Sequence, residues 1–273
     1  MTKKSQTAEE VDDKAMPVKS AEPAEKRRPS KKGKLYGPIT SIVLLLFIFF
    51  GGQYGGALVA GILIAIFGGS SQIDVSSASV IFLANALSYS LMFYLLYWFL
   101  QRRSLSLKDL GLKAPRLSDA GWAVLGFVGY VLLYMLITTV AKAVFKGLDL
   151  DQEQQLDFSR QQDGIGLMLA FVGLVIFPPV MEEILARGLL YGGLRTKLKF
   201  VPAMLITSLV FGAAHLQWST GAPLLWSAML DTFALSMVLV ALREKTGSLS
   251  APIFLHGLKN FVAFLALFVF SVT

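Results

Sequence analysis

Long uncharged apolar stretches constrain this chain more than any other feature. No Asp, Glu, Lys or Arg occurs from Leu35 to Ile73. Hydrophobic residues make up 55% of the 273 residues and charged residues only 16%. A soluble domain carries about 25% charged residues, whereas a helix that spans a bilayer needs about 20 consecutive, mostly apolar residues. The sequence therefore predicts an all-α protein, a polytopic transmembrane helical bundle embedded in a lipid bilayer.

Seven spans are expected. The first, 38–67, is long for one crossing, so we expect a span that is tilted or broken at the stretch 51–56, Gly-Gly-Gln-Tyr-Gly-Gly. Its small-xxx-small spacing is typical of a face where two helices pack closely. The other six spans are predicted at 78–100, 119–141, 165–194, 201–218, 222–242 and 248–270.

The distribution of charged residues distinguishes an N-terminal tail from the membrane-embedded part and predicts the orientation of both relative to the membrane. Residues 1–36 are rich in Lys, Glu, Ala, Pro and Ser, which predicts a disordered basic cytoplasmic tail ahead of a membrane-embedded domain at 37–273. Lys and Arg also gather in alternate loops, notably 102–116 and 195–199. The positive-inside rule then places the N-terminus in the cytoplasm and the C-terminus outside. We expect a multi-pass protein of a bacterial-type cell membrane. The net charge of +7 is assigned to lipid headgroups, with no nucleic-acid partner.

Ionisable side chains inside spans are expensive and mark function or pairing. They gather in the last four predicted spans: Glu182, Glu183, Arg187, His215, Asp231, His256 and Lys259, with Asn260 beside them. The chain has no Cys and only two His, which excludes disulfides, thiolate metal sites and Cys nucleophiles. The sequence thus predicts one functional site, in the C-terminal half. Asp231 and Lys259 are expected to form a structural salt bridge.

Helical spacing assigns partners within this group. Glu183 and Arg187 are four residues apart, so they meet on one helix face and can neutralise each other; a purely structural ion pair is the plain alternative. Glu182 is rotated by about 100° from Glu183 and stays free of that pair. His256 and Asn260 are also four residues apart and reach into the same space.

Three short stretches in the last spans follow recognisable patterns. The stretch 182–188, Glu-Glu-Ile-Leu-Ala-Arg-Gly, has the pattern E-E-x-x-x-R. The stretch 211–215 has the pattern F-x-x-x-H, and 256–260 has the pattern H-x-x-x-N. Together they resemble the motifs of the CPBP (CAAX protease and bacteriocin-processing) intramembrane protease family. Their order fits, as does the Leu-Gly-Leu stretch at 110–112. The resemblance covers roughly residues 78–270.

The resemblance implies an intramembrane endopeptidase that acts on peptides or membrane-protein segments, including CAAX-like peptides, and we expect it to need no cofactor. It assigns catalysis to Glu182, His215, His256 and Asn260, supported by Glu183 and Arg187. The first glutamate and the first histidine would activate water. The second histidine and the asparagine would donate hydrogen bonds to the tetrahedral oxyanion, where preorganised donors act strongly because bulk water is excluded.

Three alternatives stay open. Glu182, His215 and His256 could instead be the three protein ligands of a catalytic zinc, although no H-E-x-x-H motif is present and an asparagine suits an oxyanion better than zinc. A non-catalytic scaffold or immunity protein could keep the cluster for its fold. A transporter also uses buried carboxylates, but the internal repeats common in transporters are not evident.

Overall fold

The computed structural model describes residues 1–2, 34–67, 74, 77–152, 158, 164–217 and 223–270. The chain divides into two units, Met1–Lys31 and Lys32–Thr273, and the helices of the described residues belong to the second. The predicted tail falls almost wholly on residues 3–33, outside the described residues. Its disorder therefore stays a prediction.

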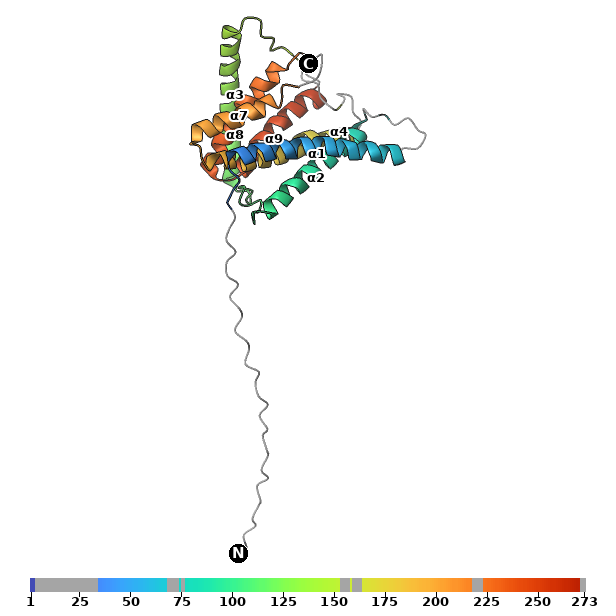
Figure 1. Cartoon of the computed structure of the whole chain (residues 1–273), viewed down its shortest axis with the longest axis vertical. Helices are drawn as coiled ribbons and strands as arrows, with labels where there is room; N and C mark the ends of the chain where they lie inside the picture. The colour runs from blue at the N-terminus through green and yellow to red at the C-terminus, as the bar shows by residue number, and fades with distance from the viewer. Residues whose placement is uncertain are drawn as a thin grey trace. The chain divides into compact units, whose positions relative to one another are not determined.

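The described part is helical and lacks strands. Its helices are α1 (Pro38–Phe67), α2 (Ala78–Gln101), α3 (Leu117–Val144), α4 (Gly164–Phe171), η1 (Val172–Ile176), α5 (Phe177–Glu183), η2 (Ile184–Leu190), α6 (Tyr191–Arg195), α7 (Phe200–Ala213), α8 (Trp226–Thr246), α9 (Ser250–Phe264) and η3 (Leu265–Val269) (Figure 1). Among the described residues, six helices are long and apolar enough to cross a membrane. The prediction of a polytopic α-helical membrane protein is confirmed.

The first span is one unbroken helix of 30 residues, so the expected break at its glycines is wrong. The glycines serve packing instead, because α1 lies along α2. A Cβ on Gly52 would collide with the side chain of Met92, and one on Gly56 would collide with the backbone of Ser88. Small residues at this spacing let two helix backbones approach closely. The small-xxx-small stretch is therefore a packing face within the chain.

The helix expected at 201–218 is shorter than predicted. α7 has 14 residues, about 21 Å, whereas the hydrocarbon core is about 30 Å thick. The backbone N–H groups of His215 and Leu216 bond to carbonyls three residues back, which tightens the last turn. Gln217 then has φ 51°, a left-handed conformation that a right-handed helix cannot continue. Thus His215 lies in a turn rather than on a helix.

The fourth span, Gly164–Arg195, is one continuous helix made of α4, η1, α5, η2 and α6. Two of its segments, η1 and η2, have the wider π-helical turn, which is frequent at functional sites. Pro178 and Pro179 lie in the first turn of α5, one residue beyond the end of η1. Proline cannot donate a backbone hydrogen bond, so the regular ladder is interrupted here. Both carboxylates of the E-E motif end the α5 segment.

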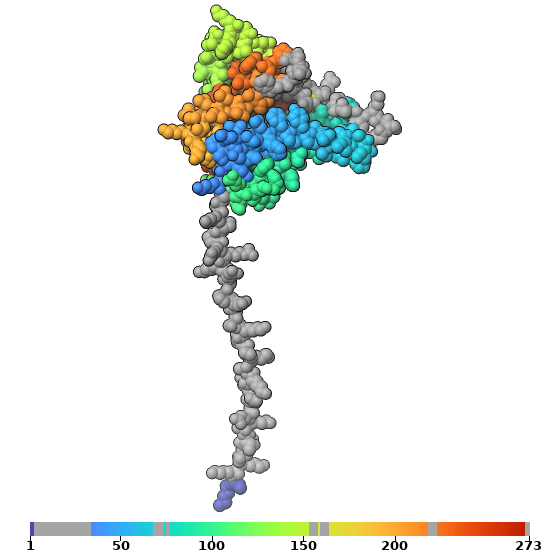
Figure 2. Space-filling view, viewed as in Figure 1, coloured from blue at the N-terminus to red at the C-terminus, as the bar shows by residue number. Residues whose placement is uncertain are grey.

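Apolar side chains cover the outward faces of the long helices. α1 exposes Val43, Phe47 and Leu58, and α3 exposes Leu125 and Leu132. Figure 2 shows α1, in blue, forming much of the visible surface. Large exposed apolar surfaces are unfavourable in water, but lipid tails cover them at no such cost. These faces are therefore the lipid-facing side of the bundle.

Candidate active site

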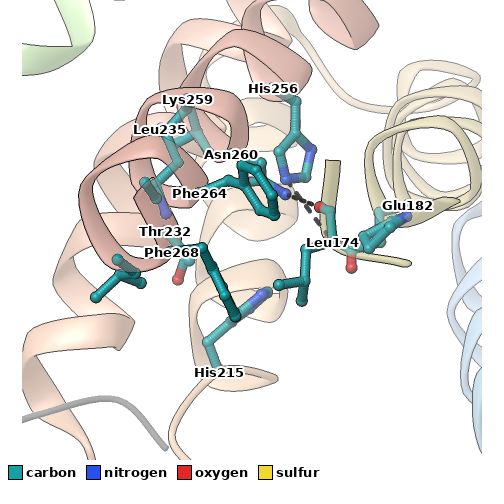
Figure 3. A pocket seen from close by; sticks show the side chains of 13 residues that line it. Leu174, Glu182, His215, Thr232, Leu235, His256, Lys259, Asn260, Phe264 and Phe268 are labelled. Atoms are coloured by element: carbon teal, nitrogen blue, oxygen red, sulfur yellow. Dashed lines mark hydrogen bonds and ion pairs between the residues drawn. The ribbon is translucent and has the colours of Figure 1, made fainter. Parts of the chain in front are cut away.

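A pocket of about 200 Å³ lies between the fourth span, the turn after α7, α8 and α9. Its lining includes all four predicted catalytic residues, as Figure 3 shows. The lining residues that bear on the chemistry are Leu174, Pro178, Glu182, His215, Thr232, His256, Lys259 and Asn260. The structure thus brings together polar side chains that are far apart in the sequence and come from several elements.

Glu183 and Arg187 form the predicted ion pair. The guanidinium Nη1 donates to Glu183 Oε1 at 2.9 Å, and both side chains are fully buried. The guanidinium also lies over the ring of Phe211, 4.4 Å from its centroid, a favourable cation–π arrangement. Burying either charge alone would cost several kcal/mol, on the order of the penalty for one desolvated ion. The pair therefore fixes the helix next to the pocket.

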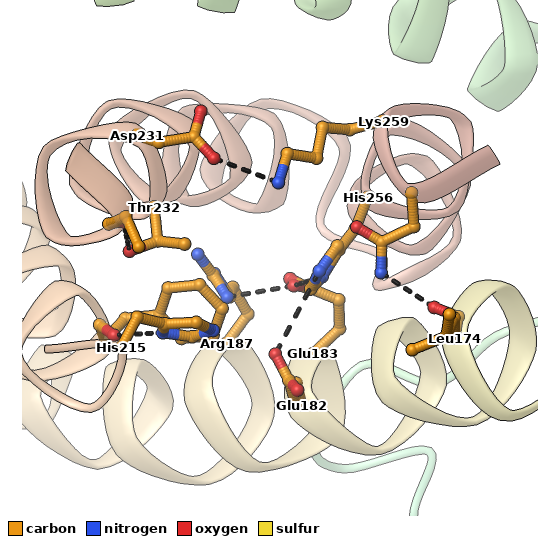
Figure 4. A network of polar contacts seen from close by, with 12 residues as sticks. Leu174, Glu182, Glu183, Arg187, His215, Asp231, Thr232, His256 and Lys259 are labelled. Carbon is orange, nitrogen blue, oxygen red and sulfur yellow. Dashed lines mark hydrogen bonds and ion pairs between the residues drawn. The ribbon is translucent and has the colours of Figure 1, made fainter. Parts of the chain in front are cut away.

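His256 lies between the two carboxylates of the motif (Figure 4). Its Nδ1 is 2.9 Å from Glu183 Oε1, and its Nε2 is 4.0 Å from Glu182 Oε2. An ionised carboxylate can only accept a hydrogen bond, so Nδ1 carries the proton that it donates to Glu183. Nε2 is consequently the ring nitrogen that faces Glu182. Glu183 thus has two partners, and one of its roles is to hold the His256 ring.

Glu182 is the less buried of the two carboxylates. Its side chain is 23% exposed and lines the pocket, and its Oε2 has no hydrogen-bond partner among the described residues. The rotation of about 100° between neighbouring helix residues explains the contrast, because one carboxylate points to Arg187 and the other to the pocket. The prediction that Glu182 stays outside the ion pair is confirmed.

His215 is oriented by the turn in which it lies. Its Nδ1 is 2.8 Å from the Phe211 carbonyl oxygen, which can only accept, so Nδ1 carries the proton. The Nε2 lone pair is then left for the pocket. Phe211 contacts the rings of both histidines, with centroids 4.9 Å away for His215 and 6.0 Å away for His256. The aromatic residue of the F-x-x-x-H motif is therefore a packing support for the whole cluster.

Asn260 also lines the pocket, and its carboxamide is already engaged. Its Nδ2 donates to the backbone carbonyl of Leu174 at 2.9 Å. Sequence reasoning missed this partner, because a backbone carbonyl carries no signature of its own. The signal in the sequence that could have found this partner is the Pro178-Pro179 pair, which follows Leu174 on the same helix.

The salt bridge expected between Asp231 and Lys259 is present. Lys259 Nζ is 2.9 Å from Asp231 Oδ2, which joins α8 to α9. The hydroxyl of Tyr130 on α3 donates to the other oxygen of the same carboxylate, a third partner that sequence reasoning did not find. This trio ties three helices together beside the pocket.

The structure does not assemble the zinc alternative. Among the described residues, no three His, Cys, Asp or Glu side chains lie close enough together to hold a metal ion. Glu182 Oε2 lies 4.0 Å from His256 Nε2, and both histidines turn Nε2 toward the pocket. The donors are of the right chemical type, but their arrangement does not fit a three-ligand site.

Comparison with known proteins agrees with the motifs. Residues 164–262 match the family model described as "Type II CAAX prenyl endopeptidase Rce1-like". The chain is 30% identical over 139 residues to a Bacillus subtilis (strain 168) protein named "Putative membrane peptidase YdiL". That alignment covers 51% of this chain and 52% of the relative, so the chain matches about half of the relative's length. No solved structure matches the chain significantly.

The matched segment runs from the start of the fourth span into α9 and includes all four predicted catalytic residues. The resemblance to the CPBP family that the three motifs indicated is thereby confirmed over this segment. The tail and the first three helices lie outside the segment that the family model matches.

Proposed function

We propose that this chain is an intramembrane endopeptidase that hydrolyses peptide bonds of membrane-associated or CAAX-like peptides with an activated water molecule. One observation carries the proposal. Glu182, whose Oε2 accepts no hydrogen bond among the described residues and faces His256 Nε2 at 4.0 Å, shares a small pocket with two histidines whose Nδ1 atoms are both engaged elsewhere. The second ring nitrogen of each histidine is therefore available where a substrate and a water molecule would meet.

In the proposed reaction, Glu182 is the general base. Water in the pocket gives a proton to the carboxylate while its oxygen attacks the substrate carbonyl. His215 Nε2 accepts a hydrogen bond from the same water and aligns it. The proton then passes to the leaving amine, and the peptide bond breaks. Two carboxylates with different surroundings thus take different roles, since Glu183 is held by Arg187 and His256.

The oxyanion of the tetrahedral intermediate is held by His256 and Asn260. Since Nδ1–H is donated to Glu183, the oxyanion role requires His256 to carry a proton on Nε2 as well. Asn260 contributes an N–H from its carboxamide. Donors fixed in advance are worth more in a site that excludes bulk water. The buried Glu183–Arg187 pair supplies that fixation for the histidine.

Substrates are proposed to be peptides that reach the pocket from the bilayer or its surface. The rival without catalysis is a scaffold or immunity protein that keeps the cluster for stability. The zinc-dependent alternative would use the metal as a Lewis acid, and no step of the reaction above depends on it.

Cleavage of a peptide library by the purified protein tests the proposal. Wild type should cleave and Glu182→Gln should not, while both melt at the same temperature in detergent. Gln has nearly the size of Glu but cannot accept the proton. Chelators should leave the rate unchanged, and loss of activity restored by zinc would replace this mechanism with the metal-dependent one. Wild-type rates in Glu182→Gln would show that the pocket is not the active site.

A further inference from the structure

The backbone carbonyl of Leu174 has no partner along its own helix. A helical carbonyl accepts from the N–H three, four or five residues later, depending on the width of the turn. Phe177, three residues later, donates its N–H to Val172 instead. The residues four and five positions later are Pro178 and Pro179, which have no N–H. The two prolines therefore keep this acceptor open toward the pocket.

Asn260 fills that position from another helix. Its Nδ2 lies 2.9 Å from the Leu174 oxygen (Figure 3), and both residues line the pocket with Glu182. Because a carbonyl can only accept, the carboxamide must turn its NH2 group, not its oxygen, toward Leu174. One N–H is used in this bond, and the second stays available on the same nitrogen.

We infer that the Leu174 carbonyl, kept open by Pro178 and Pro179, is the positioning group that aims the Asn260 carboxamide at the reacting oxygen of the substrate. This inference rests on the proposed function. An unanchored carboxamide can turn over and present its oxygen, which repels an oxyanion instead of stabilising it. The proline pair lies outside the three family motifs quoted above, so the assignment adds a supporting element that those motifs do not contain.

The kinetic test introduces a backbone N–H that can donate to the Leu174 carbonyl from its own helix. Pro178→Ala and Pro178→Val both place an N–H four residues after Leu174, where it competes with Asn260, and they differ in volume. Each should lower kcat about tenfold with KM unchanged, since an oxyanion donor acts mainly in the transition state. Asn260→Ala should lower kcat about 10²- to 10³-fold. The double variant Pro178→Ala/Asn260→Ala should be no slower than Asn260→Ala alone.

Pro202→Ala is the matched control. Pro202 lies in the first turn of α7 and is exposed, and N–H groups in a first turn have no partner within the helix. This change should leave kcat and KM at wild-type values. A lower kcat in Pro202→Ala would show that replacing a helical proline slows the enzyme for a reason unrelated to the Leu174 carbonyl.

A double-mutant cycle on thermal stability tests the Asn260–Leu174 hydrogen bond without an activity assay. Asn260→Ala should lower the melting temperature in detergent, because Leu174 loses its only donor among the described residues. The same substitution should lower it by less than half as much in the Pro178→Ala background, where the new N–H satisfies the carbonyl. Equal losses in both backgrounds would overturn the inference even if no substrate were ever found.

The outcomes separate the two proposals. If wild type cleaves and Asn260→Ala slows it, but neither Pro178 variant does, only the positioning role is wrong. If Pro178→Ala slows the enzyme and Pro178→Val does not, the loss of side-chain volume is the cause, and the positioning role of Leu174 is again wrong. If Asn260→Ala leaves kcat unchanged in an active enzyme, the oxyanion assignment of the proposed function fails.

Discussion

Removing the charge of Arg187 should destabilise the protein far more than removing an equally close surface pair. In Arg187→Met the Glu183 carboxylate stays fully buried and loses its cation. The substitution also removes the cation from the ring of Phe211. Methionine fills much of the same volume, so the change tests charge rather than packing.

The expected magnitude follows from burial. Breaking a buried ion pair by removing one partner costs about 3–5 kcal/mol, and loss of the desolvated cation–π contact adds up to about 2 kcal/mol. His256 still donates to Glu183, which keeps the total near the lower part of the combined range. We therefore expect the free energy of unfolding to fall by about 4 kcal/mol.

Arg195 and Glu244 provide the control. Their pair is as close, at 2.8 Å, but the side chains are 34% and 38% exposed. Exposed ion pairs contribute about 0–1 kcal/mol, so Arg195→Met should change stability by no more than that. Arg195 also donates to the Leu198 carbonyl oxygen, so the control loses one further hydrogen bond, and a smaller loss of stability than in Arg187→Met still assigns the difference to desolvation.

Reversible unfolding of the purified protein in mixed detergent micelles, followed by circular dichroism, measures these differences. The double variant Glu183→Leu/Arg187→Met should recover at least half of the loss, because replacing both charges by apolar groups is often close to neutral. Arg187→Met within about 0.5 kcal/mol of wild type, the range of ordinary surface substitutions, would refute the reasoning. So would a double variant as unstable as the single one.

Three further predictions concern the parts outside the pocket. A reporter fused after Thr273 should lie outside the cytoplasm, and a cytoplasmic reporter would mean that the chain crosses an even number of times. Deleting residues 2–30 should leave insertion and cleavage intact, and inactive but normally inserted protein would assign the tail to substrate capture. Gly56→Val should lower the melting temperature by several degrees, because its Cβ meets Ser88, whereas Gly61→Val, with open space around its Cβ, should not.

The sequence predicts the site better than the helices that hold it. Glu183 and Arg187 pair as their spacing requires, and Glu182 stays outside the pair because neighbouring helical residues point about 100° apart. Such local geometry follows from the helix alone. The bond from His256 to Glu183 joins residues 73 positions apart, and no spacing rule reaches that far.

Backbone acceptors are harder still to predict. The partners of His215 and Asn260 are carbonyl oxygens of Phe211 and Leu174, and every residue carries such a group. Only the consecutive prolines 178–179 hint that one carbonyl lacks its usual donor. A sequence therefore shows which side chains can react and leaves open how they are aimed.

The short α7 shows how fold and site depend on each other. Arg195, shortly before α7 begins, pairs with Glu244 near the end of α8. The start of α7 therefore lies at the same end of the bundle as the end of α8. α8 has 21 residues, about 31 Å, and its first residues follow a backbone bond from Leu225 to Leu216. The turn after α7 is thereby tied to the residues that begin α8. Ending the helix early places His215 in a turn, where its side chain lines the pocket together with Glu182 and His256.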